Sequence, residues 1–284
     1  MQKLVGIFYI IFILFSCTKN KPDPSWIEIN EWNLLSNKTN KEGELSHNFS
    51  NAYIEIDNKT IGFFELPIKL PILESGKHSI KIYPVILNNG ISASKTIYPF
   101  CIPYKIEIEL NKNKTTSITP QTSYYTDCNF WIEDFEDAGI KLKSDNGYED
   151  LLSTGNEKQF LKFGNNYGRI IVSKNKPVWQ GKTTTNSSLP QGKNIYLELD
   201  YLNTTNLLTG VYIYNNSGIS YNPNVTLNSQ SKSNLKWKKV YIDLRQMISY
   251  SINGSIFEQY FNVTNNTNND TNFVLLDNIK LIYR

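Results

Sequence analysis

Beyond its first 25 residues, the sequence almost lacks the 3.6-residue apolar repeat of amphipathic helices. It contains instead short runs in which apolar and polar residues alternate, such as YIEID, IYLELDY and KVYIDL, separated by Gly, Asn and Pro. A period of two places alternate side chains on opposite faces of an extended segment. Many short strands with frequent turns are typical of β-sandwiches, so the sequence predicts an all-β protein.

Charge and length limit the classes of function. The chain has 284 residues, and its 29 Lys and Arg nearly balance its 26 Asp and Glu. No basic cluster resembles a surface that follows phosphates, so we do not expect a nucleic-acid partner. The patterns of short alternating runs divide the sequence into a segment 26–125 and a segment 126–284. Together these segments are long enough for two domains.

The amino-terminal segment has the pattern of an export signal. Lys3 precedes the apolar run LVGIFYIIFILFS, which ends at Cys17 and is followed by the polar TKNKPDPS. The run is shorter than the roughly 20 residues that a spanning helix needs, and it fits the apolar region of a signal peptide. The stretch from Leu14 to Cys17, LFSC, resembles the lipobox of bacterial lipoproteins. The resemblance implies a signal peptide over 1–16, a lipidated Cys17 and a tether over 17–25.

Lipidation of Cys17 would place the protein on a membrane. Because a single acyl chain anchors only marginally, several chains such as palmitate on one cysteine give lasting attachment to a bilayer. The resemblance implies the outer membrane of a Bacteroidetes-like cell, with the periplasmic and outer sides both open. An ordinary signal peptide with an incidental cysteine is the alternative.

Segment 26–125 carries a partial resemblance to the small β-sandwich repeat called PEGA. The matching positions are Asp57, Gly62, Pro67, Gly76 and His78. A larger immunoglobulin-like sandwich is the other interpretation, and both imply a spacer or docking domain. We expect His78 to be a surface strand residue and not a metal ligand, because His47 is the only other histidine and no cysteine pair has ligand spacing.

Segment 126–284 resembles the galactose-binding-like jelly roll of many carbohydrate-binding modules. The resemblance rests on DFE at 134–136, LDNI at 276–279 and WKKVYIDL at 237–244. It implies that the first and last strands pair. It also implies a structural Ca²⁺ held by Glu136 and Asp277, with Glu133 as a weaker candidate, since calcium takes oxygen ligands. The alternative is that Asp277 only accepts hydrogen bonds from a neighbouring turn.

Three predicted strands of this segment have an aliphatic face and an aromatic, polar face. The aromatic and polar positions predicted to contact glycan are Tyr196, Glu198, Tyr212, Tyr214, Tyr241, Asp243 and Arg245. Aromatic rings stack on the apolar face of a sugar, and charged groups hydrogen-bond its hydroxyls. The alternative is that tyrosine simply suits a solvated strand face.

A loop site is the competing location for glycan. It would comprise Tyr167, Arg169 and Trp179, with Trp179 in KPVWQGK as a stacking platform between turns. Trp131 and Trp237 are interpreted as structural.

The sequence does not predict an enzyme. Its two histidines support no Ser-His-Asp arrangement, and only the acids Glu198, Asp200 and Asp243 keep a glycosidase alternative open. Cys101 and Cys128 can form a disulfide in an oxidising envelope or remain buried thiols.

The sequence therefore predicts a membrane-anchored, non-catalytic lipoprotein that binds a glycan through its carboxy-terminal jelly roll. A structural or assembly lipoprotein that binds another envelope protein is the alternative.

Overall fold

The computed structural model describes residues 23–145, 147–185, 187–265 and 271–284. The predicted signal peptide, Cys17 and the first part of the tether lie outside these residues. Within the described ranges, no helix has the length and apolar character needed to cross a membrane.

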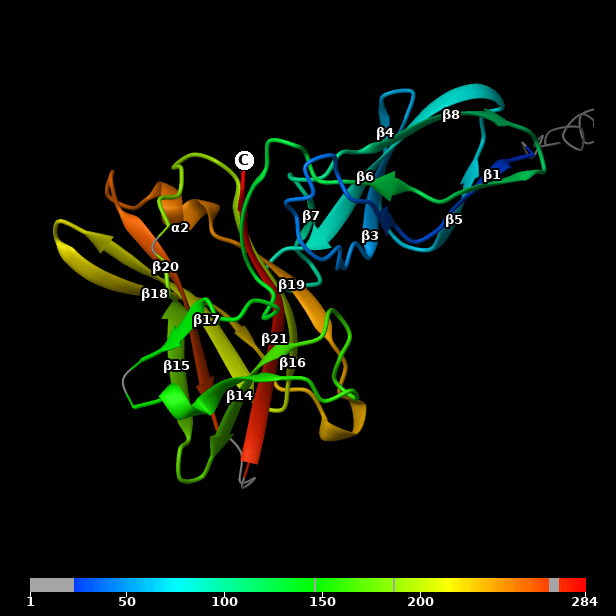
Figure 1. Cartoon of the computed structure of the whole chain (residues 1–284). Helices are drawn as coiled ribbons and strands as arrows, with labels where there is room; N and C mark the ends of the chain where they lie inside the picture. The colour runs from blue at the N-terminus through cyan, green and yellow to red at the C-terminus, as the bar shows by residue number, and fades with distance from the viewer. Residues whose placement is uncertain (1–22, 146, 186, 266–270) are drawn as a thin grey trace, which may run out of the picture.

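Residues before about 126 form a sandwich of small sheets (Figure 1). The main sheet contains β4 (Lys59–Glu65), β3 (Asn51–Ile56), β6 (Gly76–Leu87) and β7 (Lys95–Ile97), with β8 (Tyr104–Leu110) also paired to β6. A second sheet contains β5 (Ile68–Ile72), β1 (Ser25–Ile29) and β9 (Thr115–Ile118), and β2 (Asn33–Leu34) pairs with β10 (Gln121–Thr122). Ile27, Ile54 and Ile80 come from the two larger sheets and are buried together.

The remaining residues form a larger sandwich of two sheets. The first sheet contains β13 (Leu152–Gly155), β14 (Tyr167–Ser173), β21 (Thr271–Tyr283), β16 (Ile195–Asn203) and β19 (Lys238–Asp243), with β11 (Asn129–Glu133) also paired to β21. The second sheet contains β12 (Leu142–Ser144), β15 (Val178–Thr183), β20 (Ile256–Thr264), β17 (Asn206–Asn215) and β18 (Gly218–Leu227). Short helical turns are η1 (Glu149–Leu151), η2 (Lys232–Asn234) and α2 (Arg245–Ser249). The all-β prediction is confirmed.

The alternating pattern places the aliphatic faces where the sequence predicts them. Leu197 and Leu199 of β16 and Val240 and Ile242 of β19 are buried in one cluster between the two sheets. β11 and β21, the first and last strands of this sandwich, pair antiparallel, with Trp131 opposite Leu281.

The opposite face of the first sheet is covered by the amino-terminal domain. Tyr196 and Tyr241 belong to the same buried cluster as Phe49, Tyr98 and Phe100 of that domain. The two domains therefore share a core, and residues near the end of β6 lie beside β19 (Figure 1). The backbone N–H of Asn89 donates to the carbonyl of Tyr241 at 2.8 Å, which adds a backbone link between the domains.

Charged groups are buried inside this domain interface. Glu198 is fully buried, and its carboxylate accepts hydrogen bonds from the hydroxyls of Tyr98 and, at 2.8 Å, Tyr124. The ammonium of Lys239 lies 3.1 Å from Glu198 and 3.4 Å from Asp200. Hydrogen bonds and ion pairs are what make buried charges tolerable, so these contacts compensate the loss of water.

The disulfide that Cys101 and Cys128 could have formed is absent. Both are free thiols, buried in the core that the domains share. Burial raises the pKa of Cys128 to about 12, with the neighbouring charge of Asp127 adding to the rise.

The buried charge cluster predicts that loss of the Lys239 ammonium strongly lowers the stability of the folded protein. Replacing Lys239 by Met removes the cation that contacts both Glu198 and Asp200 and leaves them buried, so we expect the free energy of unfolding to fall by about 3–5 kcal/mol. Urea denaturation measures this change. The control is Lys238→Met at the exposed neighbouring position, for which we expect a change below about 0.5 kcal/mol; equal effects of the two would contradict the role of the cluster.

Thiol accessibility provides a second check. In a chain of residues 23–284, which lacks Cys17, neither remaining thiol should react with a disulfide reagent in the native state, because both are buried and thiolate is the reactive form. Both should react in urea. Rapid labelling of either thiol in the folded protein would contradict the shared core.

Candidate functional site

Three of the predicted glycan contacts are wrong because the amino-terminal domain covers them. Tyr196, Glu198 and Tyr241 are 3%, 0% and 2% exposed. They lie on the face of the first sheet that the sequence correctly separates from the aliphatic core, but another domain occupies that face. The same burial removes Glu198 as an acid of the glycosidase alternative.

Asp243 lies at the edge of the same interface, whereas the side-chain contacts of Arg245 are with Asp243 and Asn194 of its own domain. The backbone N–H of Asp243 donates to the side-chain oxygen of Asn89 at 2.9 Å, and its carboxylate accepts hydrogen bonds from the Tyr196 hydroxyl and the backbone N–H of Arg245. Arg245 is not on the strand that the sequence predicts, since β19 ends at Asp243 and α2 begins at Arg245. Its guanidinium lies 3.7 Å from the carboxylate of Asp243, which makes a local ion pair.

The competing loop site is not assembled. Trp179 is on β15 of the second sheet, where its ring is fully buried in the core and its indole N–H donates to Ser144 at 2.9 Å. Tyr167 and Arg169 are on β14 of the first sheet, and both bond to Glu157. Trp179 is therefore a core residue and cannot stack on a ligand.

The two remaining predicted tyrosines lie together on the outer face of the second sheet. Tyr212 and Tyr214 are half-buried on β17, with ring centroids 6.3 Å apart. Tyr221 of β18 and Tyr260 of β20 join them, at 5.5 and 5.0 Å from Tyr212 and 4.7 Å from each other. We call these four residues the tyrosine face.

An ion pair adjoins the tyrosine face. The ammonium of Lys182 on β15 lies 2.6 Å from the carboxylate of Glu258 on β20 and donates to the hydroxyl of Tyr214 at 2.7 Å. It also lies 5.1 Å from the ring centroid of Tyr212, within the range of a cation–π contact. Although burial opposes its charge, hydrogen bonds to Glu258 and Tyr214 raise the pKa of Lys182. The two side chains therefore form an ion pair beside the tyrosine face.

Sequence reasoning missed Tyr221 and Tyr260, although each lies in an alternating run. Glu258, Tyr260 and Asn262 occupy alternate positions of β20. Gly210 of β17 lies opposite Tyr260, and a Cβ there would come within 3.2 Å of the Tyr221 ring. The nearest atoms to such a Cβ are the backbone oxygen of Asn222 at 2.8 Å and Cα of Pro223 at 3.0 Å, so the glycine allows β17 and β18 to approach closely at this point.

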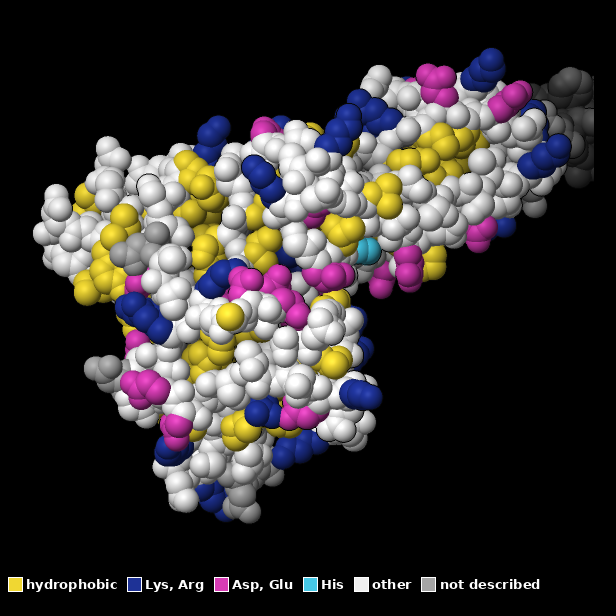
Figure 2. All heavy atoms as spheres, viewed as in Figure 1, with side chains coloured by type: hydrophobic (Ala, Val, Ile, Leu, Met, Phe, Trp, Pro, Cys, Tyr) yellow, Lys and Arg dark blue, Asp and Glu magenta, His cyan; other side chains and the backbone are white. Residues whose placement is uncertain are grey.

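The exposed edge of the tyrosine face extends onto the β17–β18 hairpin. Tyr221 is 42% exposed and Ile219 is 67% exposed on β18. Figure 2 shows hydrophobic side chains, drawn in yellow, at the surface over this hairpin. The face thus offers aromatic surface to solvent with polar groups beside it.

The predicted calcium residues have different environments. Glu136 follows β11, and its carboxylate accepts hydrogen bonds from the backbone N–H groups of Asn165 and Asn166 at 2.7 and 2.8 Å. Asp277 is buried on β21, opposite Asp200 of β16. Burial raises the pKa of Asp277 to about 8, and nearby carboxylates, including Asp200 and Glu136, add to the rise.

The weaker candidate, Glu133, is hydrogen-bonded to backbone N–H groups. Its carboxylate accepts hydrogen bonds from the N–H groups of Phe135, at 2.8 Å, and Lys141. Calcium at Glu136 and Asp277 stays a prediction.

A cavity of about 670 Å³ lies where the two domains meet. Ser46, His47 and Asn48 line it from the amino-terminal domain, and Trp237 and Lys239 line it from the other. Trp237 is half-buried, and its indole N–H donates to the carbonyl of Phe160 at 2.8 Å. Trp131 is likewise partly buried against the core.

Comparison with known proteins gives no family. No protein-family model matches the sequence, and no curated protein matches it. Solved structures that resemble the chain include TmCBM61 in complex with β-1,4-galactotriose, at 8% identity and a TM-score of 0.33, over 50% of this chain and 86% of that one. A structure of carbohydrate-binding modules from the β-sandwich superfamily has 10% identity and a TM-score of 0.36, covering 81% and 84%.

A family 11 carbohydrate-binding module of a cellulosomal cellulase from Clostridium thermocellum has 16% identity and a TM-score of 0.33, covering 54% of this chain and 94% of that one. Similarity at these scores and identities does not identify the ligand of this chain.

The environment of Asp277 predicts a pH effect. Its pKa is about 8 in the folded protein against a usual value of 3.8, so the folded state binds a proton that the unfolded state has released between these values. Stability from this group is complete below about pH 4 and is lost as the pH rises towards 8. Asp277→Asn should therefore gain stability relative to the natural protein over this range.

Urea denaturation at several pH values, with chelator present, measures this difference. Asp137→Asn, at an exposed position, serves as the control. An unchanged difference between Asp277→Asn and the natural protein from pH 4.5 to pH 8 would contradict the raised pKa.

Proposed function

We propose that the protein is a non-catalytic lipoprotein, held on the outer membrane through lipidated Cys17, that binds a glycan at the tyrosine face. The observation that carries the proposal is the group of three partly exposed tyrosine rings, Tyr212, Tyr214 and Tyr221, on adjacent strands of the second sheet. They cluster with the buried ring of Tyr260, and the ring centroids lie 4.7–6.3 Å apart. Tyrosine offers an apolar ring for stacking and a hydroxyl for hydrogen bonding in the same side chain.

The charge of the face supports a neutral glycan. Lys182 and Glu258 neutralise each other at 2.6 Å, so the face presents no unpaired charge from this pair. The Lys182 side chain is partly exposed and can still donate to a sugar hydroxyl, whereas Glu258 is buried and holds the ammonium in place. A neutral sugar needs donors and acceptors at its rim and does not need a net charge opposite to its own.

The arrangement of the strands supports a chain of several sugars. The tyrosine face draws residues from β18, β17 and β20, which are consecutive in the second sheet, with Lys182 supplied by the next strand, β15. Neighbouring strands lie about 4.8 Å apart, so a surface that crosses four of them is longer than one sugar ring. The face is also open, which suits an internal stretch of polysaccharide.

The proposal rests on rigid placement of the rings. Tyr260 is 3% exposed and Tyr212 packs against three other tyrosines. Side chains that are already fixed lose little conformational entropy when a ligand binds. The face can therefore bind sugar without first ordering its aromatic groups.

The main test is affinity electrophoresis of the protein in gels that contain neutral polysaccharides: galactan, glucomannan, xyloglucan and mixed-linkage β-glucan. We expect retardation by at least one of them. Tyr221→Ala, which removes a partly exposed ring, should weaken binding about tenfold or more, equivalent to about 1.4 kcal/mol. Tyr212→Ala should do the same.

The matched control is Tyr250→Ala, because Tyr250 is 81% exposed and lies outside the tyrosine face. It should bind as the natural protein does. Lys236→Gln tests the cavity between the domains, which this residue lines, and should also leave binding unchanged. Retention lost in Lys236→Gln but kept in Tyr221→Ala would move the glycan to that cavity.

The same gels test the alternative function. If the folded protein is retarded by no polysaccharide, with or without calcium, the glycan proposal is wrong. The assembly function, with another envelope protein as partner, then becomes the better explanation.

A further inference from the structure

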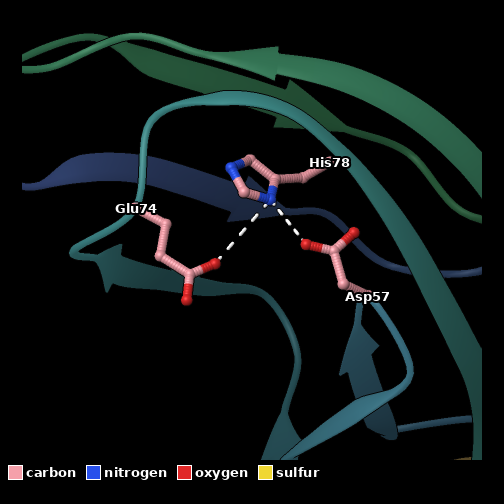
Figure 3. A group of neighbouring side chains, drawn as sticks. All are labelled: Asp57, Glu74 and His78. Carbon is pink, nitrogen blue, oxygen red and sulfur yellow. Dashed lines mark hydrogen bonds and ion pairs between the residues drawn. The ribbon is translucent and has the colours of Figure 1, made fainter.

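A group of three metal-ligating side chains lies in the amino-terminal domain, away from the tyrosine face. Asp57 follows β3, Glu74 follows β5, and His78 is on β6. One ligand atom from each lies within 4.8 Å of the other two. Figure 3 shows the two carboxylates pointing toward the same nitrogen of the imidazole ring.

The distances suit a small tetrahedral ion. Nδ1 of His78 lies 2.7 Å from Oδ2 of Asp57 and 3.7 Å from Oε2 of Glu74. Zinc bonds to nitrogen and oxygen at about 2.0–2.1 Å, so two ligands of a tetrahedral site lie about 3.3 Å apart. The two distances lie on either side of that value, and small movements of the His78 ring and the Glu74 side chain would bring both to it.

Asp57 is oriented before any ion arrives. Its Oδ1 accepts the backbone N–H of Ser79 at 2.9 Å, and its own N–H donates to the carbonyl of Ser79 at 2.9 Å. Asp57 also adopts a φ of 49° in the tight turn between β3 and β4. These constraints hold one oxygen on the backbone and direct the other, Oδ2, at His78.

The exposure of the three groups leaves a place for a water or other fourth ligand. The side chain of His78 is 12% exposed, whereas those of Asp57 and Glu74 are 41% and 53% exposed. The ring is therefore held within the domain while the carboxylates border solvent. Three protein ligands with one open position are a recognised arrangement for zinc.

The donor set also narrows the choice of ion. An imidazole nitrogen is a ligand for zinc and related transition metals, whereas calcium and magnesium prefer oxygen. We propose that Asp57, Glu74 and His78 form a site for a divalent transition metal of the zinc type, independent of the glycan function. The ion would join the loop after β5, in the smaller sheet, to the turn after β3 and the start of β6, in the main sheet.

A proton is the competitor of the ion at this site. The hydrogen bond that His78 donates to Asp57 raises the pKa of His78, and the same bond lowers the pKa of Asp57. Zinc would replace the proton between Nδ1 and Oδ2, so metal binding would release it. Without metal, the three residues would form only a surface ion pair.

The test is equilibrium dialysis of the full-length chain in detergent against ZnCl₂ at pH 7.5. We expect saturation at one Zn²⁺ per chain and an increase in melting temperature, because the ion binds the folded state. Asp57→Asn and His78→Gln should each weaken binding at least about tenfold, by analogy with the cost of losing groups that support a metal. Excess Ca²⁺ should not displace the zinc.

The matched control is His47→Gln, since His47 is the other of the two histidines in the chain. It should bind zinc as the natural protein does. Substitution with Co²⁺ then identifies the ligands, because binding at this site gives no thiolate charge-transfer band, whereas binding at a cysteine does. Near-ultraviolet circular dichroism of each variant checks that the fold is kept.

Two results would overturn the proposal. One is the absence of saturable zinc binding, which would leave an ion pair only. The other is zinc binding that persists unchanged in both Asp57→Asn and His78→Gln. Failure here leaves the glycan proposal intact, because none of these residues belongs to the tyrosine face.

Discussion

Burial of charge at the domain interface determines how the rest of the molecule is arranged. Glu198 has no exposed surface, and its carboxylate is held by Tyr98 and Tyr124 of one domain and Lys239 of the other. Because a buried carboxylate without partners is costly, the domains cannot separate without exposing this group and its partners to water. The two sandwiches are thus joined by a specific polar contact as well as by shared aromatic packing.

The interface decides which surfaces remain for a ligand. It covers the outer face of the first sheet around β16 and β19, whereas the outer face of the second sheet stays open around β17, β18 and β20. The amino-terminal domain is therefore more than a spacer, since it completes the core on one side of the larger sandwich. Any glycan site of the kind predicted from alternating tyrosines is left on the other side, where the rings of Tyr212 and Tyr221 reach the surface.

Several errors of sequence reasoning have one cause. Trp179 follows a proline and is near turn residues, which suggested a loop, yet its strand forms by pairing with β20 and turns the ring into the core. Tyr260 was overlooked for the converse reason, since its ring contacts are with Tyr212 and Tyr221 from other strands. The neighbours of His78 also depend on the fold, because the carboxylates of Asp57 and Glu74 come from other elements to lie near its ring. That His78 is not a metal ligand stays an untested prediction. Local spacing identifies ligands on one element and cannot identify ligands brought from three.

The alternating sequence by itself determined that the chain is all-β and which residues of each strand share a face. Leu197 and Leu199 were correctly placed inside and Tyr196 and Glu198 opposite them, because successive side chains of a strand must point to opposite sides. Tyr212 and Tyr214 follow the same alternating pattern. Yet Tyr196 and Glu198 are buried beneath the amino-terminal domain, whereas Tyr212 and Tyr214 border solvent. Only the tertiary structure decided this difference, because a strand's own period specifies its two faces and contains no information about what packs on them.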